Sequence, residues 1–326
     1  MRALVSGCAG FIGSHLAEAC LAKGWEVHGI DNFSTGRKEN IPQGVSTLNC
    51  DIIAADAVLG AGYDYIFHLA AKADIVPSIE KPLAYHFNNC LGTAVILEYA
   101  RTKGCKKFIY AASSTCYGSE PHCPSSEDDR IDPRYPYALT KWQGEETVMH
   151  YGRLYKLPVI SLRLFNVYGR RARTSGAYGA VMGVFCKQKL ENKPLTIVGD
   201  SSQRRDFTNV KDVVQAFILA AESPVKQEIF NIGTGKPQSV ERLADMIGGN
   251  KFLRVNMPWR AGEPRETCAD FSKAARLLNW RPLISFERGM NEIVEHIEDW
   301  RSAPLWDKES IMKATEQWHK YMGVSE

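Results

Sequence analysis

The glycine pattern at the start of the chain constrains the fold more than any other feature. Residues 3–5 form a short apolar run without turn residues, which is typical of a buried strand. Three glycines follow this run, Gly7, Gly10 and Gly13. A helical pattern then begins, so the backbone amides of Phe11 and Ile12 would face a bound anion. A strand, a glycine-rich turn and a helix in this order predict a site for the pyrophosphate of a dinucleotide.

An acidic residue in the next strand supports this prediction. Residues 26–30 form a second strand-like run, which ends at Asp31. An acid about 20 positions beyond the glycines is where the adenosine ribose is held in dinucleotide-binding folds. Because Asp31 would also repel a 2'-phosphate, we expect the cofactor to be NAD rather than NADP. Arg37 is close enough in sequence to keep NADP as an alternative.

Composition excludes several classes of protein. The chain has 326 residues, which is enough for about two domains. Its net charge of +3 is too small to indicate a nucleic-acid partner. The nine cysteines are an odd number without metal-ligand spacing, so we expect reduced thiols, a cytoplasmic protein and no metal. The start of the chain does not look like a signal peptide, and no apolar stretch has membrane length, so we expect no membrane association.

Strand-like and helix-like stretches alternate through the first half of the chain. The further expected strands are residues 65–69, 107–112 and 159–164, and the expected helices include residues 91–100 and 137–155. This alternation predicts an α/β fold, a Rossmann-type doubly wound parallel sheet with helices on both faces. Ligands bind beyond the carboxyl ends of such strands, so the segments that follow these strands should meet at the cofactor.

The second half has a different character. We expect residues 1–170 to form an NAD-binding domain, to which part of residues 210–240 returns. Residues 171–326 would form mainly a smaller, interleaved α/β substrate domain and a helical tail. Residues 170–179 are polar and glycine-containing, which is typical of a mobile loop. Residues 306–322 have the pattern of one amphipathic helix.

Three residues suggest acid–base chemistry. Tyr137 and Lys141 are four positions apart in a helical pattern, so their side chains share one face, and Ser113 ends a strand of the sheet. Lys141 would hold a ribose hydroxyl and lower the pKa of Tyr137 by its charge. Tyr137 would take the proton of a substrate hydroxyl, to which Ser113 would also bond, while the cofactor accepts a hydride.

Nine ordered motifs resemble those of the extended short-chain dehydrogenase/reductase family, the nucleotide-sugar epimerases and dehydratases. They are GCAGFIG at 7–13, DN at 31–32, DI at 51–52, HLAA at 68–71, SSTCYG at 113–118, YALTK at 137–141, RLFNVYG at 163–169, RDF at 205–207 and RAGE at 260–263. The resemblance covers residues 1–300.

The resemblance implies further site residues. On the cofactor side they are Asn32, Asp51, Ile52, Leu69, Ala70, Ala71 and Asn89, of which Asp51 and Ile52 would flank the adenine and Asn89 would lie near the nicotinamide ribose. On the substrate side they are Ser114, Thr115, Asn166, Arg205, Arg260, Glu263 and Thr267. Arg205 and Arg260 would bind the sugar-nucleotide diphosphate through their planar guanidinium groups, and Glu263 would hold the nucleotide ribose.

The leading hypothesis is an NAD-dependent epimerase of a nucleoside-diphosphate sugar, a UDP-sugar first, that acts at C4 through a transient 4-keto sugar. The alternatives are a UDP-uronic acid decarboxylase, an epimerase acting at C2, C3 or C5, a 4,6-dehydratase, and an NAD-binding regulatory or scaffold protein. Dehydratases of the family carry an acidic pair where this chain has Ser114 and Thr115, so elimination is disfavoured. Lys72 replaces a frequent glutamine and could face an acidic substrate group.

Two further expectations come from the resemblance. Family members usually form homodimers through two helices, here residues 92–102 and 142–155, which carry Val95, Leu97, Val148 and Tyr151. In hexose 4-epimerases of the family, the position of Thr267 acts as a gate, where a bulky tyrosine restricts the pocket to plain hexoses. Threonine leaves more space, which favours a UDP-N-acetylhexosamine or a UDP-uronic acid.

Overall fold

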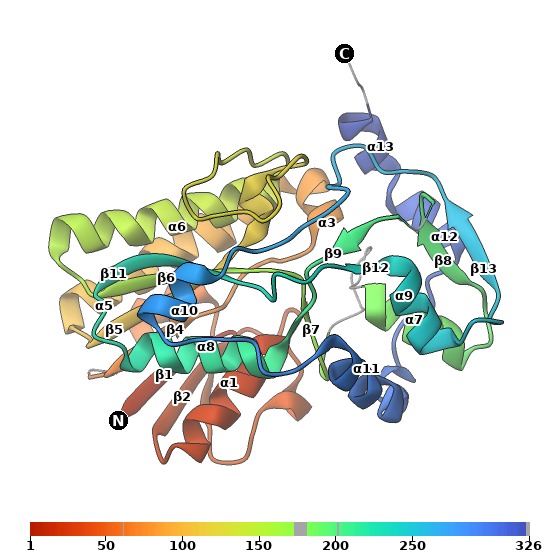
Figure 1. Ribbon diagram of the computed structural model, residues 1–326. Coiled ribbons are helices and arrows are strands. Elements are labelled where there is room, and N and C mark those ends of the chain that lie inside the picture. Colours follow the sequence, from red (N-terminus) through yellow and green to blue (C-terminus); the bar gives the residue numbers. More distant parts are fainter. Residues whose placement is uncertain (61, 173–180, 201, 324–326) are drawn as a thin grey trace.

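The architecture is a large sheet covered by helices, with a smaller part beside it (Figure 1). The computed structural model describes residues 1–60, 62–172, 181–200 and 202–323. Seven parallel strands form the large sheet in the order β11-β6-β5-β4-β1-β2-β3. They are β1 (Arg2–Ser6), β2 (Glu26–Asp31), β3 (Ser46–Asn49), β4 (Tyr65–His68), β5 (Lys107–Ser113), β6 (Val159–Leu164) and β11 (Gln227–Ile232). The predicted Rossmann-type fold is therefore confirmed.

Helices cover both faces of this sheet, which is why its central strands read as continuous apolar runs. One face carries α1 (Phe11–Ala22), α8 (Val210–Glu222) and α10 (Ser272–Leu277), and the other carries α5 (Gly92–Lys103) and α6 (Pro136–Tyr155). Every residue of β5 and β6 is buried. The edge strand β3 was not expected, because its four residues are mostly exposed and carry no apolar run.

The smaller part has its own hydrophobic core. It contains α7 (Val181–Leu190), β8 (Leu195–Val198), α9 (Val240–Gly248), β13 (Arg254–Met257) and α11 (Phe286–Glu295). Between them, α8 packs on α1 and β11 pairs with β6, so the chain returns to the large sheet after residue 209. The two parts are therefore interleaved along the chain.

Short elements connect the two parts. The strand pairs are β7 (Val167–Tyr168) with β10 (Thr208–Asn209), and β9 (Arg204–Arg205) with β12 (Gln238–Ser239). The short helices include α2 (Ala55–Val58), α3 (Ile75–Glu80), α4 (Pro82–Tyr85) and the π-helical segment η3 (His86–Leu91).

Within the described residues, no helix combines the length and apolarity that a bilayer span requires. Most of the loop expected at residues 170–179 lies outside the described residues, because the description omits residues 173–180.

The prediction of a single tail helix is wrong. The tail forms two helices, α12 (Lys308–Ala314) and α13 (Glu316–Met322), and the helical path is interrupted at Thr315. The buried hydroxyl of Thr315 donates to the carbonyl of Ile311 at 2.9 Å, in addition to the bond from the Thr315 backbone nitrogen to the same carbonyl. This bend lets α13 pack against α3 of the large part.

Candidate active site

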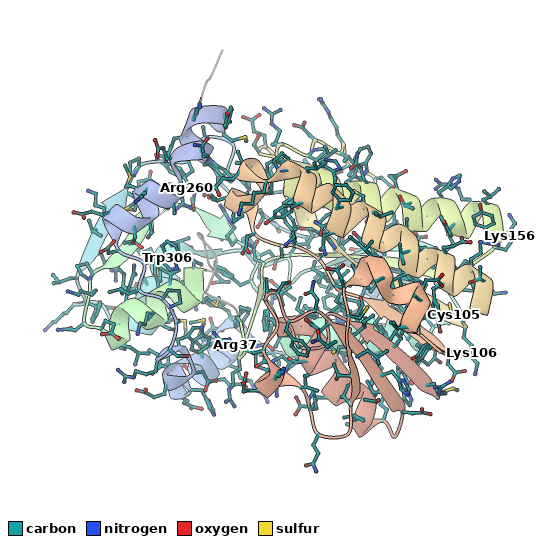
Figure 2. The ribbon with its side chains drawn as sticks, turned by 180° about the vertical axis from the view of Figure 1, so that it is seen from behind. Arg37, Cys105, Lys106, Lys156, Arg260 and Trp306 are labelled. Carbon is teal, nitrogen blue, oxygen red and sulfur yellow. The ribbon has the colours of Figure 1, made fainter. Side chains whose placement is uncertain are left out.

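One large cleft lies at the carboxyl ends of the sheet strands and extends into the smaller part. Its volume is about 820 Å³, and its walls include the glycine turn, Tyr137 and Arg260. In Figure 2, Cys105, Lys106 and Lys156, which precede β5 and β6, lie at the end of the molecule far from Arg260 and Trp306. The cleft therefore occupies the position at which doubly wound sheets bind ligands.

The glycine turn has the geometry that a dinucleotide needs. Gly7 has φ +75°, a conformation that other residues rarely adopt, and a Cβ there would lie 2.9 Å from the backbone nitrogen of Ala70. A Cβ on Gly13 would lie only 2.0 Å from the carbonyl oxygen of Gly7. The turn is thus packed so tightly that only glycine fits, and it presents the start of α1 to the cleft, where its amides can bind a pyrophosphate.

Asp31 lies at the end of β2, on the wall of the cleft. Its carboxylate accepts hydrogen bonds from the backbone nitrogens of Ala9 at 3.0 Å and Phe33 at 2.8 Å. These bonds fix the carboxylate beside the glycine turn, in the position expected for binding ribose hydroxyls. Arg37 also lines the cleft, as does Asn32.

Two expected cofactor residues have supporting positions instead. Asp51 is absent from the cleft wall; its carboxylate accepts from the Asn32 amide at 2.9 Å and caps the turn of residues 52–54. Asn89 is also absent from the wall, because its amide bonds to both backbone groups of Lys72, at 2.8 and 3.0 Å. Asn88 lines the cleft, and its buried side-chain oxygen has no hydrogen-bond partner among the described residues. An unpaired buried acceptor at this place fits a cofactor that supplies the missing donor.

Ser113, Tyr137 and Lys141 all line this cleft. Ser113 ends β5, and Pro136 begins α6, where its missing amide proton costs nothing. The Ser113 oxygen accepts from the backbone nitrogen and the hydroxyl of Thr115, at 3.3 and 2.9 Å. This leaves the Ser113 proton for its hydrogen bond with Tyr137.

Burial dominates the ionisation of the two titratable groups. The ammonium of Lys141 lies 4.3 Å from the centroid of the Tyr110 ring. Burial lowers the pKa of Lys141 to about 7, and the carboxylate of Glu145 opposes this shift. Burial raises the pKa of Tyr137, and the hydrogen bond from Ser113 only partly offsets it. Desolvation, and not the charge of Lys141 as expected from the sequence, therefore sets the direction of the shift in the Tyr137 pKa.

A buried ion pair fixes α6, and with it the catalytic residues, to the sheet. Glu145 of α6 bonds to Arg163 of β6 at 2.7 Å, and both side chains are almost completely buried. The hydroxyl of Ser161 donates to the same carboxylate at 2.7 Å. Because Glu145 lies one helical turn beyond Lys141, the ion pair holds the helix face that carries Lys141 and Tyr137.

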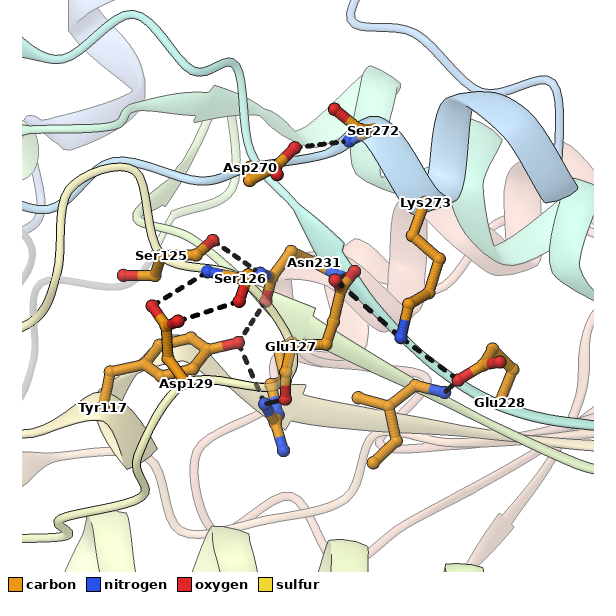
Figure 3. A network of polar contacts seen from close by, with 12 residues as sticks. Tyr117, Ser125, Ser126, Glu127, Asp129, Glu228, Asn231, Asp270, Ser272 and Lys273 are labelled. Atoms are coloured by element: carbon orange, nitrogen blue, oxygen red, sulfur yellow. Dashed lines mark hydrogen bonds and ion pairs between the residues drawn. The ribbon is translucent and has the colours of Figure 1, made fainter.

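The network extends from this pair to the edge of the sheet (Figure 3). Arg163 donates to the Tyr117 hydroxyl at 2.9 Å, which donates to Asn231 of β11 at 2.7 Å. Glu127 accepts from the backbone nitrogen of Asn231 at 2.8 Å, and Lys273 of α10 lies 3.9 Å from its carboxylate. The segment that follows Tyr117 is therefore tied to the strands β6 and β11.

The arginines expected to bind a diphosphate share one carboxylate. Glu263 lies 3.0 Å from Arg260 and 3.8 Å from Arg205, and its side chain is only 8% exposed. Gln203, which the sequence did not reveal, donates to the same carboxylate at 3.2 Å. Glu263 thus holds both guanidinium groups in the cleft region, whereas the resemblance implied a contact with ribose.

A second cavity of about 140 Å³ adjoins the cleft. It shares Ser114, Thr115, Asn166 and Arg205 with the cleft, and its other walls include Glu263, Thr267 and Trp318. The Thr267 hydroxyl donates to Asn166 at 3.1 Å and accepts from the backbone nitrogen of Asp206 at 3.2 Å. The structure therefore places Thr267 at the wall of a side cavity.

A family profile described as the NAD dependent epimerase/dehydratase family matches residues 3–233. The chain belongs to the NAD-dependent epimerase/dehydratase family. A curated relative, a putative UDP-glucose 4-epimerase of Methanocaldococcus jannaschii, is 36% identical over 303 residues, which cover 91% of this chain and 98% of the relative.

Solved structures of UDP-sugar epimerases have the same fold. UDP-glucose 4-epimerase of Thermotoga maritima with UDP-glucose has a TM-score of 0.87 and 33% identity, and covers 91% of this chain and 99% of its own. UDP-N-acetylglucosamine 4-epimerase of Methanobrevibacter ruminantium, in complex with UDP-N-acetylmuramic acid, has a TM-score of 0.85 and 31% identity, with 90% and 97% covered.

Asp206 supports the site of this epimerase/dehydratase family member, and its role was not predicted from the sequence. Its buried carboxylate accepts from the backbone nitrogens of Thr234, Gly235 and Ala269, at 2.7, 2.9 and 3.0 Å. The bond to Ala269 fixes the irregular segment that carries Thr267. The sequence contains little sign of this role of Asp206, because its three hydrogen-bond donors are backbone groups far away along the chain.

Proposed function

We propose that the protein is an NAD-dependent 4-epimerase of a UDP-sugar. The observation that carries this proposal is that Ser113, Tyr137 and Lys141 line one cleft together with the dinucleotide turn and the arginines Arg205 and Arg260. The names of the relatives, UDP-glucose and UDP-N-acetylglucosamine 4-epimerases, support the substrate class. Incubation of the purified protein with a panel of UDP-, GDP-, CDP- and dTDP-sugars tests it, since epimers, carbon dioxide or no product are distinct results.

In this proposal the chain's own residues handle the proton. Tyr137 takes the proton of the C4 hydroxyl, and Ser113 holds the same oxygen through a hydrogen bond. Bound NAD supplies the acceptor, and later the donor, of the C4 hydride. After the 4-keto sugar has turned over in the cleft, Tyr137 returns the proton, so the reaction needs no external oxidant. Lys141 would bind ribose hydroxyls, and such hydrogen bonds favour its charged form over the neutral form that burial promotes.

The alternatives within the family lack support at this site. Ser114 and Thr115 present hydroxyls to both cavities, and neither is an acid or base that could eliminate water. Lys72 lines the cleft, and so does Asp74, whose carboxylate would repel the carboxylate of a uronic acid. We therefore place decarboxylation and dehydration behind epimerisation.

We further propose a cytoplasmic role in carbohydrate metabolism, in which the epimer feeds polysaccharide biosynthesis. The nine cysteines are all free thiols. Burial raises the pKa of the Cys20 and Cys116 thiols to about 12, which keeps them protonated and unreactive. This use of cysteine fits a reducing compartment.

The substitution Thr267→Tyr tests the proposed gate. We expect the tyrosine to fill the side cavity and to lower kcat/KM for UDP-N-acetylglucosamine by about tenfold or more, while UDP-glucose is affected less. In the wild type, UDP-N-acetylhexosamine should be turned over at least as well as UDP-glucose. Steady-state kinetics on both substrates measures this, and an equal loss on both would show that Thr267 is no gate.

Cofactor choice should depend on Asp31. We expect the wild type to bind NAD more tightly than NADP, because the fixed carboxylate of Asp31 repels a 2'-phosphate. Asp31→Asn removes the negative charge and keeps a side chain of the same size. The affinities for NAD and NADP should therefore approach each other. Isothermal titration with both cofactors gives the ratio, and equal affinities in the wild type would contradict the assignment.

We propose a homodimer that uses α5 and α6. Of the four residues expected at this interface, Leu97 and Val148 instead pack in the core beneath the helices, so they belong to the sheet side. Leu91, Leu154 and Tyr155 are the exposed apolar residues at the ends of these helices. Light scattering at micromolar concentration should give twice the chain mass of 36.4 kDa, and a monomer would refute the dimer.

A further inference from the structure

The tail helix α13 carries Trp318, which lines the smaller cavity beside Thr267. We propose that Trp318 is a specificity-determining residue: it forms the wall that limits the length of the substituent on the sugar of the substrate. The inference rests on the proposed function, because it names what the same site selects.

The helix α13 touches both sides of the cleft. On the side of the large sheet it packs against α3, and the Trp318 ring lies 5.6 Å from the ring of Tyr135. On the other side, the indole N–H of Trp318 donates to the carbonyl of Ala261 at 2.8 Å, next to Arg260. Figure 1 shows α13 above the junction of the two parts.

These contacts make Trp318 a fixed wall rather than a loose cover. The side chain is only 1% exposed, and the hydrogen bond to Ala261 sets the direction of its ring. Met322, one turn further along α13, lies against Gly262, where even a Cβ would approach it to 2.5 Å. Any group that pushes Trp318 aside must therefore break its hydrogen bond and move the loop that carries Arg260.

The chemistry of the cavity suits a short acyl substituent. Hydroxyls of Ser114, Thr115 and Thr267 line it, and the rings of Tyr117 and Trp318 add apolar surface. An amide-linked acetyl group presents the same combination of a polar amide and a methyl group. Since the cavity measures about 140 Å³ and shares Ser114 and Thr115 with the cleft, a sugar in the cleft can extend one small substituent into it.

The test compares acyl chains of different length. We measure kcat/KM for UDP-N-acetylglucosamine and UDP-N-butanoylglucosamine in the wild type and in Trp318→Ala. The ratio of butanoyl to acetyl turnover should rise about tenfold or more in Trp318→Ala, because the alanine opens the end of the cavity. Trp318→Phe keeps a ring at this place and should stay near the wild-type ratio. The control is Tyr321→Ala on the same helix, whose side chain is 61% exposed and should leave the ratio unchanged.

An unchanged ratio of butanoyl to acetyl turnover, or an equal loss of kcat/KM on both substrates, would overturn the proposal. Trp318 would then have only a structural role. If Trp318→Ala does not fold, a ligand-binding measurement on the wild type tests the proposal instead. The wild type is labelled with 5-fluorotryptophan, and the Trp318 signal among its seven tryptophans is assigned by Trp318→Phe. UDP-N-acetylglucosamine should shift this fluorine signal and UDP alone should not. Equal shifts would also overturn the proposal. If the wild type turns over no UDP-sugar, the proposed function is wrong. The fluorine signal then still tests whether Trp318 contacts the N-acetyl group of a bound UDP-sugar.

Discussion

Tyr137→Phe should reduce turnover about 100-fold or more, because a positioned acid–base group typically contributes at least that factor. Phenylalanine keeps the ring that packs at the start of α6 and removes only the hydroxyl that bonds to Ser113. NAD should therefore remain bound with nearly the wild-type affinity. Steady-state epimerisation rates and a titration with NAD measure the two effects separately.

The matched control for this variant is Tyr155→Phe, which removes a hydroxyl from the exposed end of the same helix. It should have wild-type activity. Activity of Tyr137→Phe within a few-fold of the wild type would remove Tyr137 from the proposed mechanism. A loss of NAD binding as large as the loss of turnover would instead show that the hydroxyl supports the cofactor.

Glu145→Gln should lower the free energy of unfolding by about 3–5 kcal/mol, because it leaves the buried guanidinium of Arg163 without its counter-charge. The variant should also move the pKa of Lys141 further below about 7, since the Glu145 carboxylate raises that pKa in the wild type. If the Lys141 ammonium holds the cofactor ribose, NAD affinity in the variant should decline at a lower pH than in the wild type. Urea unfolding and NAD titrations between pH 6 and pH 9, a window of roughly one to two units on either side of this pKa, measure both changes.

Glu146→Gln provides the control, because it removes the neighbouring, exposed carboxylate of α6. It should unfold close to the urea concentration of the wild type. The double variant Glu145→Leu with Arg163→Met removes both charges and should be more stable than Glu145→Gln alone. If Glu145→Gln unfolded together with Glu146→Gln, the ion pair would not be the element that fixes α6.

Local signals in the sequence were enough for the first half of the fold. The strands β1, β5 and β6 are buried on both faces, so each appears as a mainly apolar run, interrupted in β6 by Ser161 and Arg163. Their bounds agree with the predictions to within one or two residues. The dinucleotide turn was also predictable, because Gly13 lies too close to Gly7 for any side chain. Tyr137 and Lys141 share one helix face by spacing alone.

Predictions failed where the helical period changes or where the local sequence pattern does not indicate the structure. In η3 the backbone follows a π-helix, whose hydrogen bonds reach one residue further than those of an α-helix. Asn88 lines the cleft, while Asn89 points to the backbone of Lys72, and no helical spacing distinguishes the two. At Thr315 a side-chain hydrogen bond coincides with the break of a helix that the apolar pattern alone would continue.

The sheet, the cofactor turn and the acid–base residues were predictable from local patterns, because each depends on neighbours within a few positions. Which distant groups share a site depends instead on the packing of the folded chain. Glu263 binds two arginines, and Trp318 lines a cavity whose other walls come from segments far away in the sequence. Such contacts depend on how separate elements pack, and burial then sets the pKa of Lys141 and Tyr137. Spacing along the chain contains no record of either effect.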